Sequence, residues 1–341
     1  MTTIKDIAAK TGFSPTTISI VLNNKRLARY ISAATKLIIR DAARDMGYRP
    51  NIFARSLRAR RSYMVGLLVC DLLDPYCAPI IKQIEATLIP HNYTLLISDL
   101  GNYQNRYRQA LDILAGRRVD GIIAIANQLP FDLQELRRTV AETPVVVIGR
   151  ICRGPEIPYF VVGDQAGGYL SARHLLDLGH RDFGFIWDNC SFQWSALRWK
   201  GVVKALAEAG LTPLPEQIAR IDNDSSDSGY QAAQRLLESG RRFTAICAID
   251  DQIAFGAIRA IFDAGLSVPE KMSVIGFDDL TISRYYNPPL TTIAQPLEKL
   301  GELATQALLA RMANKRKHVS SRTLRPVLVE RRSTRALGPS S

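Results

Sequence analysis

The sequence has few cysteines and histidines and no long apolar run. Its five cysteines are odd in number, scattered and never arranged as Cys-x-x-Cys, which argues against a disulfide framework and a structural zinc site. The four histidines are also scattered, so we expect no metal site and no cofactor. No apolar stretch has membrane-spanning length and the N-terminus lacks the pattern of a signal peptide, which favours a cytoplasmic protein with no membrane partner.

Motifs of common enzyme classes are absent too. The chain has no Gly-x-Ser-x-Gly, no phosphate-binding Gly-x4-Gly-Lys-Ser/Thr, no Gly-x-Gly-x-x-Gly after a strand and no His-Glu-x-x-His. We therefore expect a protein that is not an enzyme. An α/β enzyme and a periplasmic-type sugar-binding protein remain the alternative classes.

Basic charge is concentrated near the N-terminus. Residues 1–62 hold 13 Lys and Arg against three Asp and Glu, so they carry +10 of the chain's net charge of +12. A localised basic segment attracts polyanions and supplies contacts to phosphates. A solvated basic face without a partner is the alternative interpretation.

Residues 3–23 have the pattern of two short helices joined by a tight turn. Thr3 caps the first helix with Asp6 as its capping-box partner, and Gly12 ends it. Ser14 caps the second helix, with Pro15 at its first position. This pattern predicts a helix-turn-helix, whose second helix enters the DNA major groove. An ordinary pair of amphipathic helices would give a similar pattern.

A third helix and a linker are predicted next. The helix runs from a Ser32 cap to Met46, and Gly47 and Pro50 prevent its continuation. Residues 50–61 then form a short segment with an apolar face and a basic flank. We interpret this segment as a linker that folds on DNA, with a plain basic linker as the alternative.

From Met64 onward, apolar runs alternate with helical stretches. Strands are predicted at 65–70, 94–98, 121–125 and 145–148, with helices at 79–90, 103–116 and 131–141. The pattern restarts near Gly167, with strands at 183–187, 244–249 and 273–277. A last strand, helix and strand at 291–295, 296–313 and 324–329 are expected to return to the first group. Two parallel α/β lobes of this kind leave a ligand-binding cleft that closes by hinge motion.

A set of short motifs occurs in a fixed order along the chain. They are Thr3–Ala8, Ser14–Ser19, Gly47–Asn51, Ala54–Leu57, Val119–Ile123, Gly179–Arg181, Ile275–Asp279, Pro289–Ile293 and Val329–Thr334. Together they resemble the LacI/GalR family of transcription factors over essentially the whole length. The resemblance implies an N-terminal three-helix helix-turn-helix DNA-binding domain plus an α/β two-lobed effector domain like the periplasmic binding proteins. The implied domains are 1–49, a hinge helix and linker at 50–62, and 63–335, with one lobe at 63–163 plus 291–330 and the other at 164–290.

The resemblance also implies a homodimer that binds a near-palindromic double-stranded DNA operator, each helix-turn-helix reading one half-site. The residues that match DNA-contacting positions are Thr3, Ser14, Pro15, Thr16, Thr17, Ile20, Asn23, Asn51, Ala54, Arg55 and Leu57. Ile20 departs from the family's polar residues and offers only an apolar contact, for example to a thymine methyl. Leu57 matches a leucine that wedges into the minor groove, although it packs on the lobe in the alternative interpretation. The C-terminal tail lacks a heptad pattern, which favours a dimer over a tetramer.

A small-molecule effector site is implied in the cleft. The matching residues are Tyr76, Cys77, Phe192, Trp194, Arg198, Asp224, Asp250 and Asp278. Carboxylates, a guanidinium and aromatic faces suit a hydroxyl-rich ligand, so the effector is expected to be a sugar or sugar derivative. Phe192 and Trp194 stand where the family's purine repressor has polar residues, which favours a sugar over a purine; core packing is the alternative role for each aromatic. The predicted function is a repressor controlled by this effector, which acts as inducer or as co-repressor.

Overall fold

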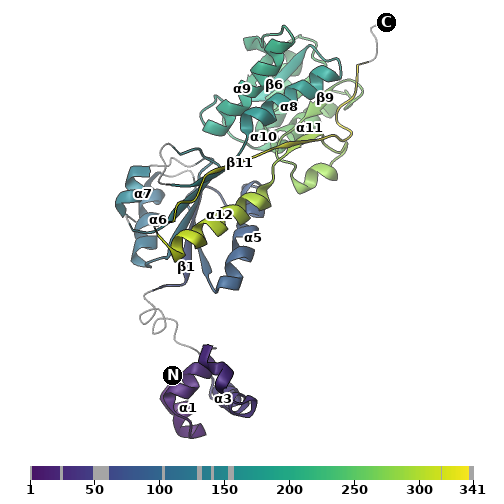
Figure 1. Ribbon diagram of the computed structural model, residues 1–341. Helices are drawn as coiled ribbons and strands as arrows, with labels where there is room; N and C mark the ends of the chain where they lie inside the picture. The colour runs from purple at the N-terminus through teal and green to yellow at the C-terminus, as the bar shows by residue number, and fades with distance from the viewer. Residues whose placement is uncertain are drawn as a thin grey trace. The chain divides into compact units, whose positions relative to one another are not determined.

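The computed structural model describes residues 2–23, 26–48, 61–101, 104–128, 133–139, 142–152, 157–315 and 317–337 of the chain. It divides into two compact units, Met1–Ser62 and Tyr63–Ser341 (Figure 1). Among the described residues, no helix has the length and apolar character needed to cross a membrane. The predicted linker at 50–61 lies outside the described residues, apart from Arg61.

The first unit consists of short helices around a small core. Helices α1 (Ile4–Thr11), α2 (Pro15–Leu22) and α3 (Ala33–Asp45) contact one another, and the 3-10 helix η1 (Arg26–Tyr30) connects α2 to α3. Each α-helix contributes buried side chains at helical spacing, because one face of each helix must leave water. These side chains are Ile7, Ile18, Val21, Ile39, Ala42 and Ala43.

Short polar side chains and a glycine define the ends of α1 and α2. The Asp6 carboxylate accepts a hydrogen bond from the Thr3 backbone N–H at 2.8 Å, and Thr3 Oγ1 accepts one from the Asp6 N–H. Ser14 Oγ accepts from the Thr17 N–H at 3.1 Å. Gly12 has φ +72°, a left-handed conformation that glycine adopts without a steric penalty. The predicted helix-turn-helix is confirmed.

The first lobe of the second unit is built on a parallel sheet with helices on both faces. Its strand order is β11-β5-β4-β3-β1-β2 in the part of the chain that is described. The strands are β1 (Met64–Val69), β2 (Thr94–Asp99), β3 (Gly121–Ile125), β4 (Val145–Ile148), β5 (Tyr159–Val162) and β11 (Arg322–Leu324). Helices α5 (Cys77–Leu88) and α12 (Leu297–Ala313) pack on one face, and α6 (Gln104–Gly116) and α7 (Leu133–Thr139) on the other (Figure 1).

The second lobe repeats this design on a smaller sheet. Its order is β7-β6-β8-β9, all parallel, within the described residues. The strands are β6 (Phe183–Trp187), β7 (Ile218–Arg220), β8 (Ala245–Ala248) and β9 (Ser273–Ile275). Helix α8 (Asp164–Asp177) packs against α9 (Gln193–Glu208), and α10 (Ser226–Glu238) packs against α11 (Asp251–Asp263).

Glycines allow α8 and α9 to approach closely. A Cβ at Gly168 would collide with the carbonyl oxygen of Arg198, and one at Gly201 would collide with that of Gln165. Only a residue without a side chain permits this backbone contact. This backbone contact sets the position of Arg198, on α9, relative to the start of α8.

The chain crosses between the lobes after β5, between β9 and α12, and after β11. In the crossing region, β10 (Thr292–Ala294) pairs antiparallel with β12 (Val327–Val329). Helix α12 contacts α5, so this part of the C-terminal segment returns to the first lobe as predicted (Figure 1).

The single strand predicted at 324–329 is wrong. β11 ends at Leu324 and β12 begins at Val327, because Pro326 has no N–H to continue a ladder. The residues after β12 pack on the second lobe instead. There Ser333 Oγ donates to the carbonyl oxygen of Val274 at 2.6 Å, and the Leu337 N–H donates to that of Leu178 at 2.9 Å.

Candidate functional site

A cavity of about 580 Å³ in the second unit has walls from both lobes. Most of the residues that line it lie in loops that follow the parallel strands, where open α/β sheets bind their ligands. The first lobe contributes Asp71 and Leu73–Tyr76 after β1 and Asn127 and Gln128 after β3. The second lobe contributes Asp188, Phe192, Trp194, Asp224, Asp250 and Asp278 after β6 to β9, together with Arg198 of α9 and Asp164 of α8.

Arg198 is the buried cation of this cavity. It is 4 % exposed, and its Nε lies 3.0 Å from Asp164 Oδ1 while one terminal nitrogen lies 3.4 Å from Asp278 Oδ1. The other terminal nitrogen donates to the carbonyl oxygen of Ile249 at 2.9 Å. The guanidinium also stacks 3.6 Å over the Phe277 ring. Several partners therefore hold its charge in place.

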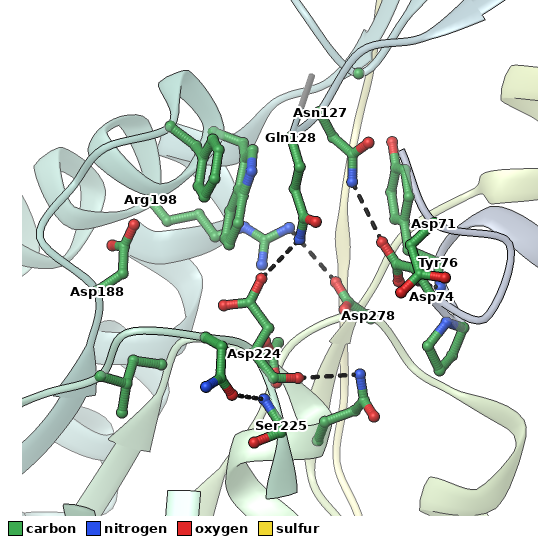
Figure 2. A pocket seen from close by; sticks show the side chains of 18 of the residues that line it. Asp71, Asp74, Tyr76, Asn127, Gln128, Asp188, Arg198, Asp224, Ser225 and Asp278 are labelled. Carbon is green, nitrogen blue, oxygen red and sulfur yellow. Dashed lines mark hydrogen bonds and ion pairs between the residues drawn. The ribbon is translucent and has the colours of Figure 1, made fainter. Parts of the chain in front are cut away.

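The aspartates of the second lobe have raised pKa values. Burial raises the pKa of Asp224 to about 6 and that of Asp278 to about 8, against the opposing effect of Arg198. Burial also raises the pKa of Asp250 well above its ordinary value, and the charge of Asp224 adds to this increase. Figure 2 shows Arg198, Gln128, Asp224 and Asp278 converging on one part of the cavity. A ligand there meets carboxyl groups that titrate near neutral pH.

Two aromatic rings form a flat surface in the cavity wall. Phe192 and Trp194 have centroids 6.1 Å apart and planes within 6° of parallel. The Arg198 guanidinium lies 4.6 Å from the Trp194 ring centroid, which ties this surface to the charged cluster. Such faces cover the apolar side of a ring-shaped ligand.

Hydrogen bonds join the lobes directly at the cavity. Gln128 Nε2, on the first lobe, donates to Asp224 Oδ2 on the second at 2.7 Å (Figure 2). The Ile151 backbone N–H donates to Gln193 Oε1 at 2.7 Å, again across the lobes. A ligand that bonds to these groups competes with the link between the lobes.

Some polar atoms of the lining are buried without a partner. Among the described residues, Asp188 Oδ2, Asn127 Oδ1 and Trp194 Nε1 have no hydrogen bond. The other oxygen of Asp188 accepts from the Cys190 N–H at 3.0 Å and from the Ser195 hydroxyl. Buried polar groups are normally hydrogen-bonded, so unpaired ones in a cavity wall indicate groups that a ligand satisfies.

The first unit presents the predicted DNA-reading helix at its surface. Pro15 and Thr16 of α2 are exposed, and Thr17 and Ile20 are half-buried. Thr3 and Ser14 are exposed and cap helices, while the exposed Asn23 donates from Nδ2 to the Ser19 carbonyl oxygen at 2.8 Å. The hinge residues predicted to contact DNA lie outside the described residues; they are Asn51, Ala54, Arg55 and Leu57.

Known proteins match the chain along its length. Residues 3–51 match the family of bacterial regulatory proteins called the lacI family, and residues 172–334 match a periplasmic binding protein-like domain. The HTH-type transcriptional repressor PurR of Edwardsiella ictaluri is 38% identical over 341 residues, which cover 99% of this chain and 98% of that protein. The chain belongs to the lacI family of bacterial regulators.

Solved structures of the lacI family share its fold. The lac repressor dimer bound to operator and the anti-inducer ONPF aligns with a TM-score of 0.86 and 27% identity, covering 98% of this chain and 99% of that one. A lacI-family regulator from Enterococcus faecium with bound ribose aligns with a TM-score of 0.73 and 28% identity, covering 81% of this chain and 100% of that one. The chain is thus a DNA-binding transcriptional repressor controlled by a small molecule, and not an enzyme.

The structure brings together all but one of the residues predicted to bind the lacI-family effector. Tyr76, Phe192, Trp194, Arg198, Asp224, Asp250 and Asp278 line the cavity. Cys77 does not, and its predicted place in the cleft is wrong. It is the first residue of α5 and is buried in the apolar core between this helix and the sheet, so burial raises the pKa of its thiol.

Several lining residues were not predicted. One of them is Asp164, which pairs with Arg198. Asp74, Asn127, Gln128 and Asp188 were also missed. Two of these residues come directly after an apolar strand or one residue later, and that rule alone would have identified them; they are Asn127 and Asp188.

Proposed function

We propose that the effector of this repressor is a sugar or sugar derivative bound in the cavity. The observation that carries the proposal is the combination of parallel aromatic faces with surrounding carboxylate and amide groups. Sugar hydroxyls donate to carboxylates and accept from amides, and the ring's apolar face packs on an aromatic. The ribose-bound member of the family supports this class of ligand.

The proposed contacts divide the ligand between the lobes. Phe192 and Trp194 cover one face of the sugar ring, while Asp224 and Asp250 accept from its hydroxyls. Arg198 uses three donor groups within the protein and directs its remaining N–H groups toward the ligand. Tyr76 completes the wall from the first lobe.

On the DNA side we propose a homodimer that binds a near-palindromic operator in the cytoplasm. The lac repressor dimer on its operator supports this assembly. Each α2 reads one half-site in the major groove, with Thr16 and Thr17 as polar contacts and Ile20 against a thymine methyl. Leu57 wedges into the minor groove at the operator centre.

Effector binding controls the DNA contact through lobe closure. A ligand that bonds to Gln128 and Asp224 replaces the direct link between them, so the preferred separation of the lobes changes. The chain enters the first lobe immediately after the linker, and a shift in that lobe therefore biases the linker. This is a coupling between two sites through a two-state element.

Calorimetric titration with neutral mono- and disaccharides and with purine bases tests the effector proposal. We expect a sugar to bind and to change the affinity for operator fragments selected from genomic DNA. Phe192→Ala should weaken that sugar by about 10-fold, because an aromatic face contributes roughly 1.4 kcal/mol. Binding of a purine base in place of every sugar would overturn the proposal.

A further inference from the structure

The charge of the cavity is strongly one-sided. Among the described residues that line it, eight are aspartates and one, Arg198, is a cation. The lining therefore holds far more acidic than basic groups, in a concave space where the field of like charges adds.

The positive charge of Arg198 is already matched within the protein. Its guanidinium pairs with Asp164 at 3.0 Å and with Asp278 at 3.4 Å, both of them buried or nearly so. An anionic ligand that took over the guanidinium would displace these carboxyl groups, and Asp164 would then remain buried without a cation. Breaking a buried ion pair in this way is strongly unfavourable.

The remaining carboxylates have acceptor capacity that the protein does not use. Asp224 is bonded through Oδ2 to Gln128, and Asp250 uses Oδ1 to cap α11 through the Ile253 N–H. Asp188 Oδ2 is buried and has no partner in the part of the chain that is described. The wall therefore offers acceptors in excess of donors, and it suits a ligand rich in O–H or N–H groups.

We propose that this cavity selects its effector by charge, binding an amino sugar more tightly than the parent sugar and rejecting the phosphorylated or carboxylated form. The inference rests on the proposed sugar-binding function and narrows it. An ammonium group gains attraction from Asp224, and it favours the charged form of Asp250, which burial and the charge of Asp224 oppose. A phosphate adds negative charge next to the same groups.

The first test separates an aqueous bacterial metabolite extract at pH 7 into fractions that bind an anion exchanger, bind a cation exchanger or bind neither. Thermal unfolding of the full chain is then measured with each fraction. We expect the neutral or cationic fraction to raise the melting temperature through the cavity. Stabilisation that acts through the cavity and comes from the anionic fraction, or no stabilisation by any fraction, overturns the inference.

Charge-only variants locate the effect in the cavity, because anions can also bind the basic first unit. Asp224→Asn keeps the acceptor for Gln128 and removes the charge. It should weaken a cationic ligand by about 10-fold, because hydrogen bonds to charged groups are stronger than neutral ones, and it should strengthen an anionic one. Asp263→Asn, at the exposed end of α11, is the matched control and should change neither. A cationic ligand that binds Asp224→Asn as tightly as the parent protein refutes the inference.

The identity of the stabilising compound separates this inference from the proposed function. A sugar phosphate bound in the cavity would contradict the charge inference and leave the sugar proposal standing. A neutral or cationic compound that is not a sugar would contradict the sugar proposal and leave the charge inference standing.

Discussion

Replacing Arg198 with methionine removes the cation that two buried carboxyl groups share. Methionine fills most of the space of the arginine stem, so the main change is the loss of the guanidinium. Asp164 and Asp278 then stay buried without their partner, which costs about 3–5 kcal/mol when one side of a buried pair is removed. We expect Arg198→Met to lower the free energy of unfolding by about 3 kcal/mol, near the lower end of that range. The loss is at the lower end because Asp278, with a pKa of about 8, holds its proton at pH 7.

Urea unfolding followed by circular dichroism at pH 7 measures this loss. Arg173→Met is the matched control, because Arg173 pairs with Asp177 on α8 with side chains that are 44% and 55% exposed. An exposed pair contributes little to stability, so this variant should behave like the parent protein. Adding Asp164→Asn to Arg198→Met should restore part of the stability, because one unpaired carboxylate is then neutral. Equal losses in the Arg198 and Arg173 variants would refute the assignment of Arg198 as a buried, paired charge.

Three further changes probe the linker, the helix contact and the pH dependence. Leu57→Ala should weaken operator binding in a mobility-shift assay and leave calorimetric effector binding intact; unchanged operator affinity contradicts the wedge. Gly201→Ala should lower the melting temperature because its Cβ collides with the Gln165 carbonyl oxygen, whereas Gly116→Ala, with nothing within 4 Å of its Cβ, should not. Asp278 keeps its proton in the folded state up to about pH 8, whereas the unfolded chain loses it near the ordinary pKa of about 3.9. Its contribution to stability is therefore complete below about pH 4 and is lost as pH rises toward 8. Asp278→Asn should reduce the dependence of the free energy of unfolding on pH in this range, and an unchanged dependence contradicts the raised pKa.

Local features of the fold were predictable from the sequence because their causes are local. The Thr3 and Ser14 caps, the Gly12 turn and the Ser32 cap depend on residues within one turn of the helix. The buried strands were recognisable as continuous apolar runs, since a parallel sheet is covered on both faces.

Features that depend on distant parts of the chain were not predictable in this way. Cys77 turns into the core because α5 begins at that residue, and the direction of a helix relative to its sheet is set by packing. Asp164 was passed over because its role depends on Arg198, 34 positions away, which reaches it only through the contact of α8 with α9. The break between β11 and β12 had a local signal in Pro326, but the apolar residues on either side of it favoured one strand.

The docking of the C-terminal residues on β9 has a consequence for the order in which the protein matures. A chain is made from its N-terminus, and the first unit has its complete core once residue 48 has emerged. Neither lobe can complete its packing until the C-terminal segment has been made. The first lobe includes α12 and β11, and the second includes the contact of Ser333 with Val274. During synthesis, the DNA-reading unit can therefore fold well before the effector cavity is complete. Any product of premature termination upstream of α12 would contain a folded DNA-reading unit and lack the means to be regulated.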